Sequence, residues 1–167
     1  LENFKTYFWR INKKKINFKF KLVGSAGNKD LIYFFKSIKK LNFEYIQNIN
    51  WRNSLNSAKE IKSFDLGVMP IIKNKITEGK CAYKLLEYMA FEITFVASGI
   101  GENNLIVNNN TNGYLANSKK EWVKNIMEVK YNKKKNKKMV NISKNIIKNK
   151  YSVEVIAKKF KKIINDL

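Results

Sequence analysis

Two lysines and a glutamate stand at helical spacing near the predicted start of a helix. Lys80 and Lys84 lie four residues apart, so a helical start places both on one face, and Glu87 follows three residues later on a neighbouring position. A diphosphate is bound by cations and free backbone N–H groups, and a ribose diol by a carboxylate acceptor. The segment therefore offers the groups that a nucleoside diphosphate requires. The same spacing also fits a surface helix with a simple Lys84–Glu87 ion pair.

Two glycine-containing turns follow predicted strands. One is the sequence GSAG, which begins with Gly24 and Ser25, and the other is GIGEN, which contains Gly101 and Glu102. Backbone N–H groups in such turns can bind an anion, but each turn is equally compatible with an ordinary connection between a strand and a helix. Glu102 is a poor neighbour for a phosphate and a good acceptor for a sugar hydroxyl.

An alternation of strands and helices positions these segments. The sequence patterns predict strands over residues 18–23, 43–49, 64–70, 93–98 and within 108–116, and helices over 1–15, 29–40, 54–63, 82–91, 119–131, about 139–150 and 152–166. A loop over 71–82 holds Thr77, Glu78 and Gly79, and the Lys/Asn-rich spacer 132–138 is expected to be a solvated loop.

We therefore expect one α/β domain over residues 1–167, with a Rossmann-like, mostly parallel sheet and helices on both faces. Ligands bind such sheets at the carboxyl ends of the strands, beside helix N-termini. The segments singled out above all fall at this edge.

The composition excludes several kinds of site. The 167 residues include one cysteine and no histidine, which excludes an internal disulfide, a cysteine-based zinc site and imidazole catalysis. No apolar run approaches the ~20 residues of a transmembrane helix. We therefore expect a reduced, cytoplasmic globular domain, and we expect Cys81 to be a small buried residue without chemistry.

The net charge of +21 allows three explanations. The basic residues are nearly all lysine and occur with many Asn and Ile, a mixture typical of an AT-rich genome. An anionic membrane surface or nucleic acid would also suit this charge. Because the lysines are spread over the whole chain, nucleic acid is the least favoured partner, and a basic α/β nucleic-acid-binding module is the alternative to an enzyme.

The predicted tail helix 152–166 is rich in both lysine and apolar residues. Its apolar positions are Val153, Val155, Ile156, Phe160, Ile163 and Ile164. Such a helix either packs against a core or lies on an anionic membrane.

Five motifs occur in a fixed order in the centre of the chain: D-L-G-V-M-P, G-K-C-x-x-K-L-x-E-Y-M-A, V-A-S-x-x-G-x-N, N-G-Y-L-A and E-W. In this order and at this spacing, residues 19–124 resemble the C-terminal, donor-binding domain of group 1 (family 4) glycosyltransferases of the GT-B fold. The resemblance implies retaining transfer of a hexosyl group from a nucleoside-diphosphate sugar to an acceptor, such as a bacterial cell-envelope glycan or a lipid-linked sugar. It also implies that the site needs no metal and no cofactor.

The resemblance assigns roles to single residues. Glu87 matches the second of two family glutamates, a ribose ligand, whereas the first falls on Gly79, one place after Glu78. Lys80 and Lys84 match lysines that we expect to face the donor phosphates. The whole predicted donor-binding set is Gly24, Ser25, Thr77, Glu78, Gly79, Lys80, Lys84, Leu85, Glu87, Gly101 and Glu102, with no catalytic residue and no metal ligand assigned.

The chain departs from the family pattern in two ways. Glu92 and Thr94 stand where the family usually has Gly and Pro, at the turn before strand 93–98. Family enzymes also have an N-terminal domain that binds the acceptor, and we expect that domain elsewhere in the same gene or on a separate chain. We therefore expect residues 1–167 to bind a donor weakly and to transfer no sugar alone. We further expect peripheral contact with the inner face of an anionic membrane.

Overall fold

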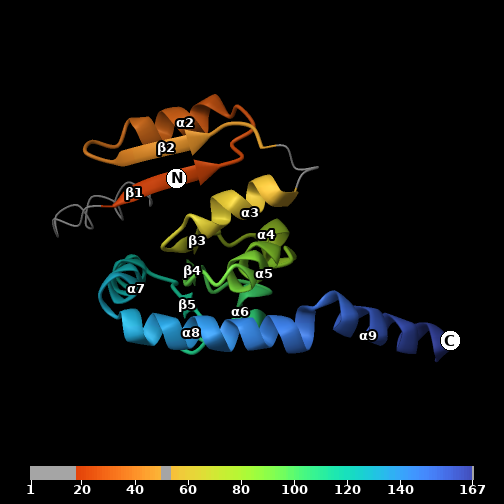
Figure 1. The fold of residues 1–167 in the computed structure, drawn as a ribbon. Helices are drawn as coiled ribbons and strands as arrows, with labels where there is room; N and C mark the ends of the chain where they lie inside the picture. Colours follow the sequence, from red (N-terminus) through yellow and green to blue (C-terminus); the bar gives the residue numbers. More distant parts are fainter. Residues whose placement is uncertain (1–17, 50–53, 167) are drawn as a thin grey trace.

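The computed structural model describes residues 18–49 and 54–166 (Figure 1). The helix expected over 1–15 lies outside the described residues. The elements follow in this order: β1 (Lys19–Val23), α2 (Lys29–Lys36), β2 (Asn42–Ile46), α3 (Ser54–Lys62), β3 (Gly67–Met69), α4 (Lys75–Glu78), α5 (Tyr83–Ala90), β4 (Phe95–Ala97), α6 (Asn103–Ile106), β5 (Tyr114–Leu115), α7 (Lys119–Tyr131), α8 (Lys133–Ile146), the π-helix η1 (Ile147–Tyr151) and α9 (Val153–Asn165).

The strands β1 and β2 form a parallel pair that α2 covers. Apolar and basic residues alternate along β1, so one face of the pair is aromatic, and Phe20 stacks on Phe35 of α2 with the ring centroids 4.7 Å apart. The side chain of Asn28 accepts a hydrogen bond from the N–H of Leu31 and so caps the start of α2.

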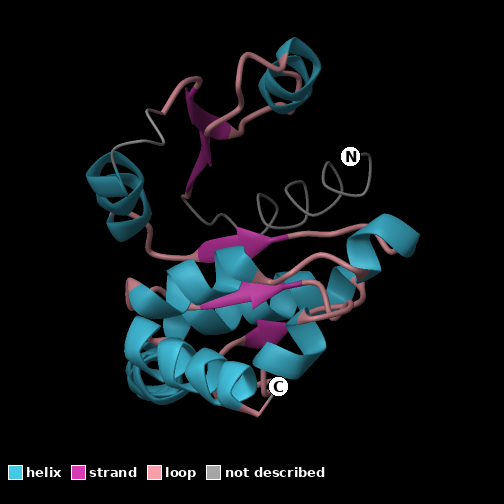
Figure 2. Cartoon of the chain, turned by 90° about the vertical axis from the view of Figure 1, so that its right-hand side faces the viewer, coloured by secondary structure: helices cyan, strands magenta, loops and turns pink. Residues whose placement is uncertain are grey.

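The strands β3, β4 and β5 form a second parallel sheet with helices on both faces (Figure 2). Successive residues of β4 point to opposite faces. Phe95 packs with Leu85 and Met89 of α5, and Val96 packs with Trp122 of α7. Both faces of β4 are therefore buried, as a central parallel strand requires.

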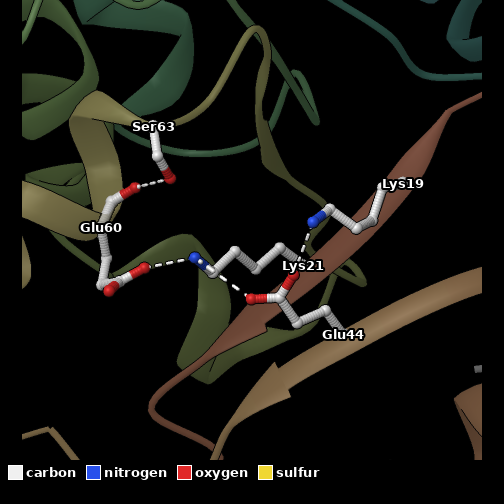
Figure 3. A network of polar contacts seen from close by, with 5 residues as sticks. All are labelled: Lys19, Lys21, Glu44, Glu60 and Ser63. Atoms are coloured by element: carbon white, nitrogen blue, oxygen red, sulfur yellow. Dashed lines mark hydrogen bonds and ion pairs between the residues drawn. The ribbon is translucent and has the colours of Figure 1, made fainter.

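The predicted fold class, an α/β domain with parallel strands and covering helices, is confirmed. The detail that differs is that the strands of the described ranges form two sheets rather than one. Lys21 of β1 joins the two parts, because it forms ion pairs with Glu44 of β2 and with Glu60 of α3 (Figure 3). The hydrogen bond with Glu60 is the main reason why the pKa of Lys21 is raised.

The prediction that residues 132–138 form a solvated loop is wrong. The segment from Lys133 onward is the first part of α8, and the side chain of Asn132 caps it by accepting from the N–H of Lys135 at 3.1 Å. Asn136 and Met139 are buried one turn apart, and the Asn136 amide donates to the carbonyl of Val129. These anchors hold a lysine-rich helix on the domain while its other face stays in water.

Candidate functional site

The loops after β3 and β4 are joined at the carboxyl edge of their sheet. The N–H of Ser98 donates to the carbonyl of Met69 at 3.1 Å, and the N–H of Ile71 donates to the Ser98 hydroxyl at 2.9 Å. The amide of Asn103 donates to the carbonyl of Ser98 at 2.8 Å. The structure thus brings together two of the segments that the sequence singles out, the loop before α5 and the turn before α6.

Gly101 lies directly against the backbone of Glu78. Its φ is +51°, and a Cβ at this position would overlap the Glu78 carbonyl oxygen and lie 3.2 Å from the Glu78 Cα. Only glycine tolerates both conditions. The Glu78 carboxylate is 3.4 Å from the ammonium of Lys73, and Glu102 is exposed at the start of α6.

Lys84 and Glu87 lie on α5 and form an ion pair with each other. The Lys84 side chain is 40% exposed and that of Glu87 16% exposed, so the carboxylate is the more enclosed partner. Because α5 leads from the carboxyl edge to the start of β4, Lys84 lies in the turn of the helix at that edge and Glu87 lies in the next turn. The i,i+3 ion pair that the sequence allowed is therefore present in the structure.

No side chain caps the N-terminus of α5, where Ala82 stands. The first N–H groups of a helix lack partners within the helix and attract an anion, as does the helix dipole. Lys80, two residues before Ala82, is exposed. The start of α5 thus combines backbone donors with two ammonium groups, which is the arrangement that a diphosphate requires.

The other face of α5 fixes the helix on the sheet. The hydroxyl of Tyr88 donates to the carbonyl of Val68 at 3.3 Å, and a Cβ on Gly67 would lie 2.7 Å from the Tyr88 ring. Burial, with a smaller contribution from the charge of Glu87, raises the pKa of Tyr88 to about 12. Tyr88 is therefore a neutral anchor that explains why glycine stands at position 67.

Three predicted residues of this region have structural contacts of their own. Thr77 belongs to a capping box, in which its hydroxyl accepts from the N–H of Asn74 and its N–H donates to the Asn74 side chain, both at 2.9 Å. Gly79 ends α4 with a φ of −87°. Leu85 is fully buried in the core, and its N–H donates to the carbonyl of Ala82. The structure therefore assigns the Leu85 side chain to the core and its N–H to the first turn of α5, and its contact with a donor stays a prediction.

Gly24 and Ser25 lie at the carboxyl end of β1, in the other sheet. The N–H of Gly24 donates to the carbonyl of Ile46 at 2.9 Å, and Gly24 has a φ of +74°. Ser25 is buried, and its hydroxyl has no hydrogen-bond partner among the described residues. The hydrogen bonds of Ser98 join the loops after β3 and β4 and do not include this turn.

Three polar residues that organise the edge are not among the residues predicted from the sequence. Ser98 and Asn103 are buried and hold the two loops, and the side chain of Asn117 accepts from the N–H of Gly99 at 3.0 Å. These residues could have been predicted from the pattern of a serine and an asparagine next to the ends of apolar strands. Cys81 differs from expectation as well, because it is exposed beside Lys80.

A hollow of about 260 Å³ is lined by Met127, Glu128, Tyr131 and Asn132. It lies at the C-terminal end of α7, which runs back from the carboxyl edge, so it belongs to the opposite end of the sheet. Within residues 18–49 and 54–166, no three His, Cys, Asp or Glu side chains gather in a way that could hold a metal ion.

The family model described as glycosyl transferases group 1 matches residues 2–130. The fold is similar to the C-terminal domain of a glycosyl transferase group 1 family protein (LpcC) from Francisella tularensis, with a TM-score of 0.60 and 20% identity over 75% of this chain and 62% of that one. It is also similar to a glycosyltransferase from Rickettsia africae ESF-5, with a TM-score of 0.74 and 14% identity over 98% of this chain and 44% of that one. The chain therefore spans less than two thirds of the length of either protein. No curated protein sequence matches it.

Proposed function

Because the chain belongs to the group 1 glycosyltransferases, we propose that it is the donor-binding half of a retaining enzyme of this family. Its substrate in this proposal is a nucleoside-diphosphate sugar. The supporting observation is that hydrogen bonds of Ser98 join the two loops at the edge where α5 starts without a side-chain cap. Lys80 precedes this start by two residues, and the Lys84–Glu87 ion pair lies on the first two turns of α5. Cations, backbone donors and one carboxylate are the groups that a nucleoside diphosphate needs.

Each group has a role in this proposal. Lys80 and Lys84 bind the diphosphate together with the start of α5, and Glu87 accepts a hydrogen bond from the ribose diol. During transfer the bond between the anomeric carbon and the diphosphate oxygen breaks, and the diphosphate leaves with the electron pair. The acceptor hydroxyl oxygen forms the new bond to the anomeric carbon on the same face, and its proton passes to the leaving diphosphate, which still carries negative charge. The lysines and the helix dipole stabilise this charge, so the proposed site requires neither a metal nor another cofactor.

The second substrate belongs to another part of the enzyme. We place the acceptor, a bacterial cell-envelope glycan or a lipid-linked sugar, on a domain outside residues 1–167, either in the same gene or on a separate chain. Transfer of a hexosyl group then takes place in the cytoplasm when both domains are present. Residues 1–167 alone should bind the donor weakly and transfer no sugar.

Calorimetric titration tests donor binding. UDP, GDP, ADP and their sugar conjugates are titrated into the chain up to millimolar concentration, and at least one series should bind saturably. Lys84→Ala should weaken binding about tenfold, since a charge-assisted hydrogen bond contributes roughly 1.5–3 kcal/mol. The absence of heat with all three series would contradict the proposal.

Glu87→Ala separates the ribose role from a purely structural one. If Glu87 only neutralises Lys84, its removal frees the ammonium and tightens binding of the diphosphate. If Glu87 binds the ribose, its removal weakens binding. The ion pair of Lys144 with Glu92, at 2.6 Å, is the matched control, because Glu92 follows the C-terminal end of α5 and so lies at the opposite edge. Lys144→Ala and Glu92→Ala should leave donor binding unchanged.

A further inference from the structure

The side chain of Asn117 joins the loop after β5 to the turn after β4. Its amide oxygen accepts a hydrogen bond from the N–H of Gly99 at 3.0 Å. The last backbone bond between these two strands runs from the N–H of Ala116 to the carbonyl of Ala97, at 2.9 Å. A strand in a parallel ladder bonds to one neighbour through every second residue, so Gly99 is the next position after Ala97. The Asn117 side chain therefore extends the pairing of β4 and β5 by one bond beyond the strands.

The Asn117 amide lies tightly against Gly99. A Cβ at position 99 would lie 2.7 Å from the Asn117 Oδ1 and 2.9 Å from its Nδ2. The Oδ1 of Asn104 would lie 3.1 Å from the same Cβ, but the Asn104 side chain makes no hydrogen bond within residues 18–49 and 54–166. Both asparagines are exposed. Two exposed amides thus flank Gly99, and of the two it is Asn117 that bonds to it.

The backbone of Asn117 is fixed by α7. Its N–H donates to the Glu121 carboxylate at 2.7 Å, beside the capping box that starts α7. The amide of Asn125, on the same helix, donates to the carbonyl of Leu115 at 2.9 Å and so holds the end of β5. The Asn117 side chain therefore reaches the turn after β4 from a fixed position, without being part of the core.

The turn after β4 is a compact unit. The N–H of Asn104 donates to the carbonyl of Gly101 at 3.0 Å, and Gly101 lies directly against the backbone of Glu78. Lys80 follows Glu78 by two residues, and α5 begins three residues after Lys80. A displacement of Gly99 moves this turn, and the turn is the surface on which Glu78 rests. The bond at Gly99 therefore acts on the segment that leads into α5.

We propose that Asn117 is a positioning residue of the donor site. By holding Gly99, it keeps the turn after β4 against Glu78 and so fixes the place of Lys80 and of the first N–H groups of α5. This inference rests on the proposed function, in which those groups bind a diphosphate. It adds the loop after β5 to the site, as a part that acts without touching the donor. Without the bond, the donor has to order these loops when it binds, which costs affinity.

The backbone N–H chemical shifts of the ligand-free chain test the positioning step. Asn117→Leu removes the acceptor at similar volume, and it should move the signals of Gly101, Glu78 and Gly79. Asn117→Asp keeps an acceptor at the same place and should leave the Glu78 and Gly79 signals where they are. Asn104→Leu is the matched control, because it makes the same change at the other amide beside Gly99, and it should also leave them in place. Unmoved Glu78 and Gly79 signals in Asn117→Leu would overturn the proposal.

Calorimetric titration of UDP, GDP and ADP connects this position to binding. For the nucleotide that binds, Asn117→Leu should raise the Kd about fivefold, as expected for the loss of one hydrogen bond between uncharged groups. Asn117→Asp and Asn104→Leu should change the Kd by less than about twofold. Rescue by Asp separates positioning from direct contact, because a donor that bonds to the Asn117 amide N–H group would lose that bond in both Asn117 variants. Equal weakening in Asn117→Leu and Asn117→Asp, with unmoved Glu78 signals, would overturn the positioning role.

The two experiments separate this inference from the proposed function. If the original chain binds none of the three nucleotides, the proposed function fails, and the chemical shifts still decide whether Asn117 positions Glu78. If Asn117→Leu binds as tightly as the original chain, the donor site stands and the positioning role fails. Residue 117 is exposed, so thermal unfolding of Asn117→Leu should stay close to that of the original chain. Asn117→Ala, which removes the same acceptor without adding apolar surface, should give the same shifts and the same loss of affinity.

Discussion

Gly101 packs its Cα against the carbonyl of Glu78, in the left-handed region of backbone space. We predict that Gly101→Ala lowers the free energy of unfolding by at least about 2 kcal/mol, because the new Cβ meets both an unfavourable φ and a backbone oxygen. Urea denaturation measures this change. Gly79→Ala is the control, because its φ is −87° and its Cβ would have room, 3.9 Å from the nearest backbone atom. Equal stability of the two variants would contradict the assigned role of Gly101.

The turn after α5 contains a residue with a strained backbone conformation, and a substitution by glycine can relieve this strain. Glu92 has a φ of +61°, and its carboxylate pairs with Lys144 on the surface at 2.6 Å. We predict that Glu92→Gly raises the free energy of unfolding by up to about 1 kcal/mol, because glycine removes the strain while an exposed ion pair contributes little. Thermal unfolding gives the measurement, and Glu92→Ala, which loses the ion pair but keeps a Cβ, should not be stabilised. A Glu92→Gly chain that melts below the original one would refute the prediction.

Local signals in the sequence predict α7 at its observed bounds. Ser118 and Glu121 form a capping box, and Trp122 and Val129 are buried at helical spacing. The meeting of two loops at the carboxyl edge also follows from the order of strands, since parallel strands end at one edge. The residues that join the two loops cannot be predicted from local sequence patterns, because the Gly101–Glu78 contact joins residues 23 positions apart.

The two separate sheets and the placement of Leu85 depend on contacts that no local pattern contains. The alternation of strands and helices predicts that the strands are parallel. It does not predict the order in which they pair, because strand pairing joins residues that are far apart in the sequence. Leu85 belongs to the motif that also contains Lys84 and Glu87, but the turn of the helix directs it into the core. A motif therefore identifies a segment, and only the helical phase decides which of its residues face a ligand.

The capping box of α7 should make stability depend on pH. The N–H of Asn117 donates to the Glu121 carboxylate at 2.7 Å and, with Ser118, lowers the pKa of Glu121 below its ordinary value of 4.5. A lowered pKa in the folded state stabilises the protein above the unfolded value, and this stabilisation is lost as the pH falls through the folded value. We predict that Glu121→Gln destabilises the chain at pH 7 and that the difference shrinks toward pH 3.

Urea denaturation at pH 7 and at pH 3 measures this difference. Glu102→Gln is the control, because the exposed Glu102 side chain makes no capping hydrogen bond, and it should differ little from the original chain at either pH. A Glu121→Gln deficit of the same size at both pH values would contradict the electrostatic origin of the effect.

Cys81 provides a direct reporter of the proposed site. It is the one cysteine of the chain, it is exposed, and it stands between Lys80 and the uncapped start of α5. We predict that the nucleoside diphosphate that binds in calorimetry slows alkylation of Cys81 by iodoacetamide, because a diphosphate held by Lys80 and α5 covers the thiol. Protection should saturate with ligand at the calorimetric Kd. The nucleoside without phosphates should protect poorly, and Lys84→Ala should shift protection to higher ligand concentration. An alkylation rate that the diphosphate leaves unchanged, while calorimetry still detects binding, would place the phosphates away from α5 and would require a different site for the donor.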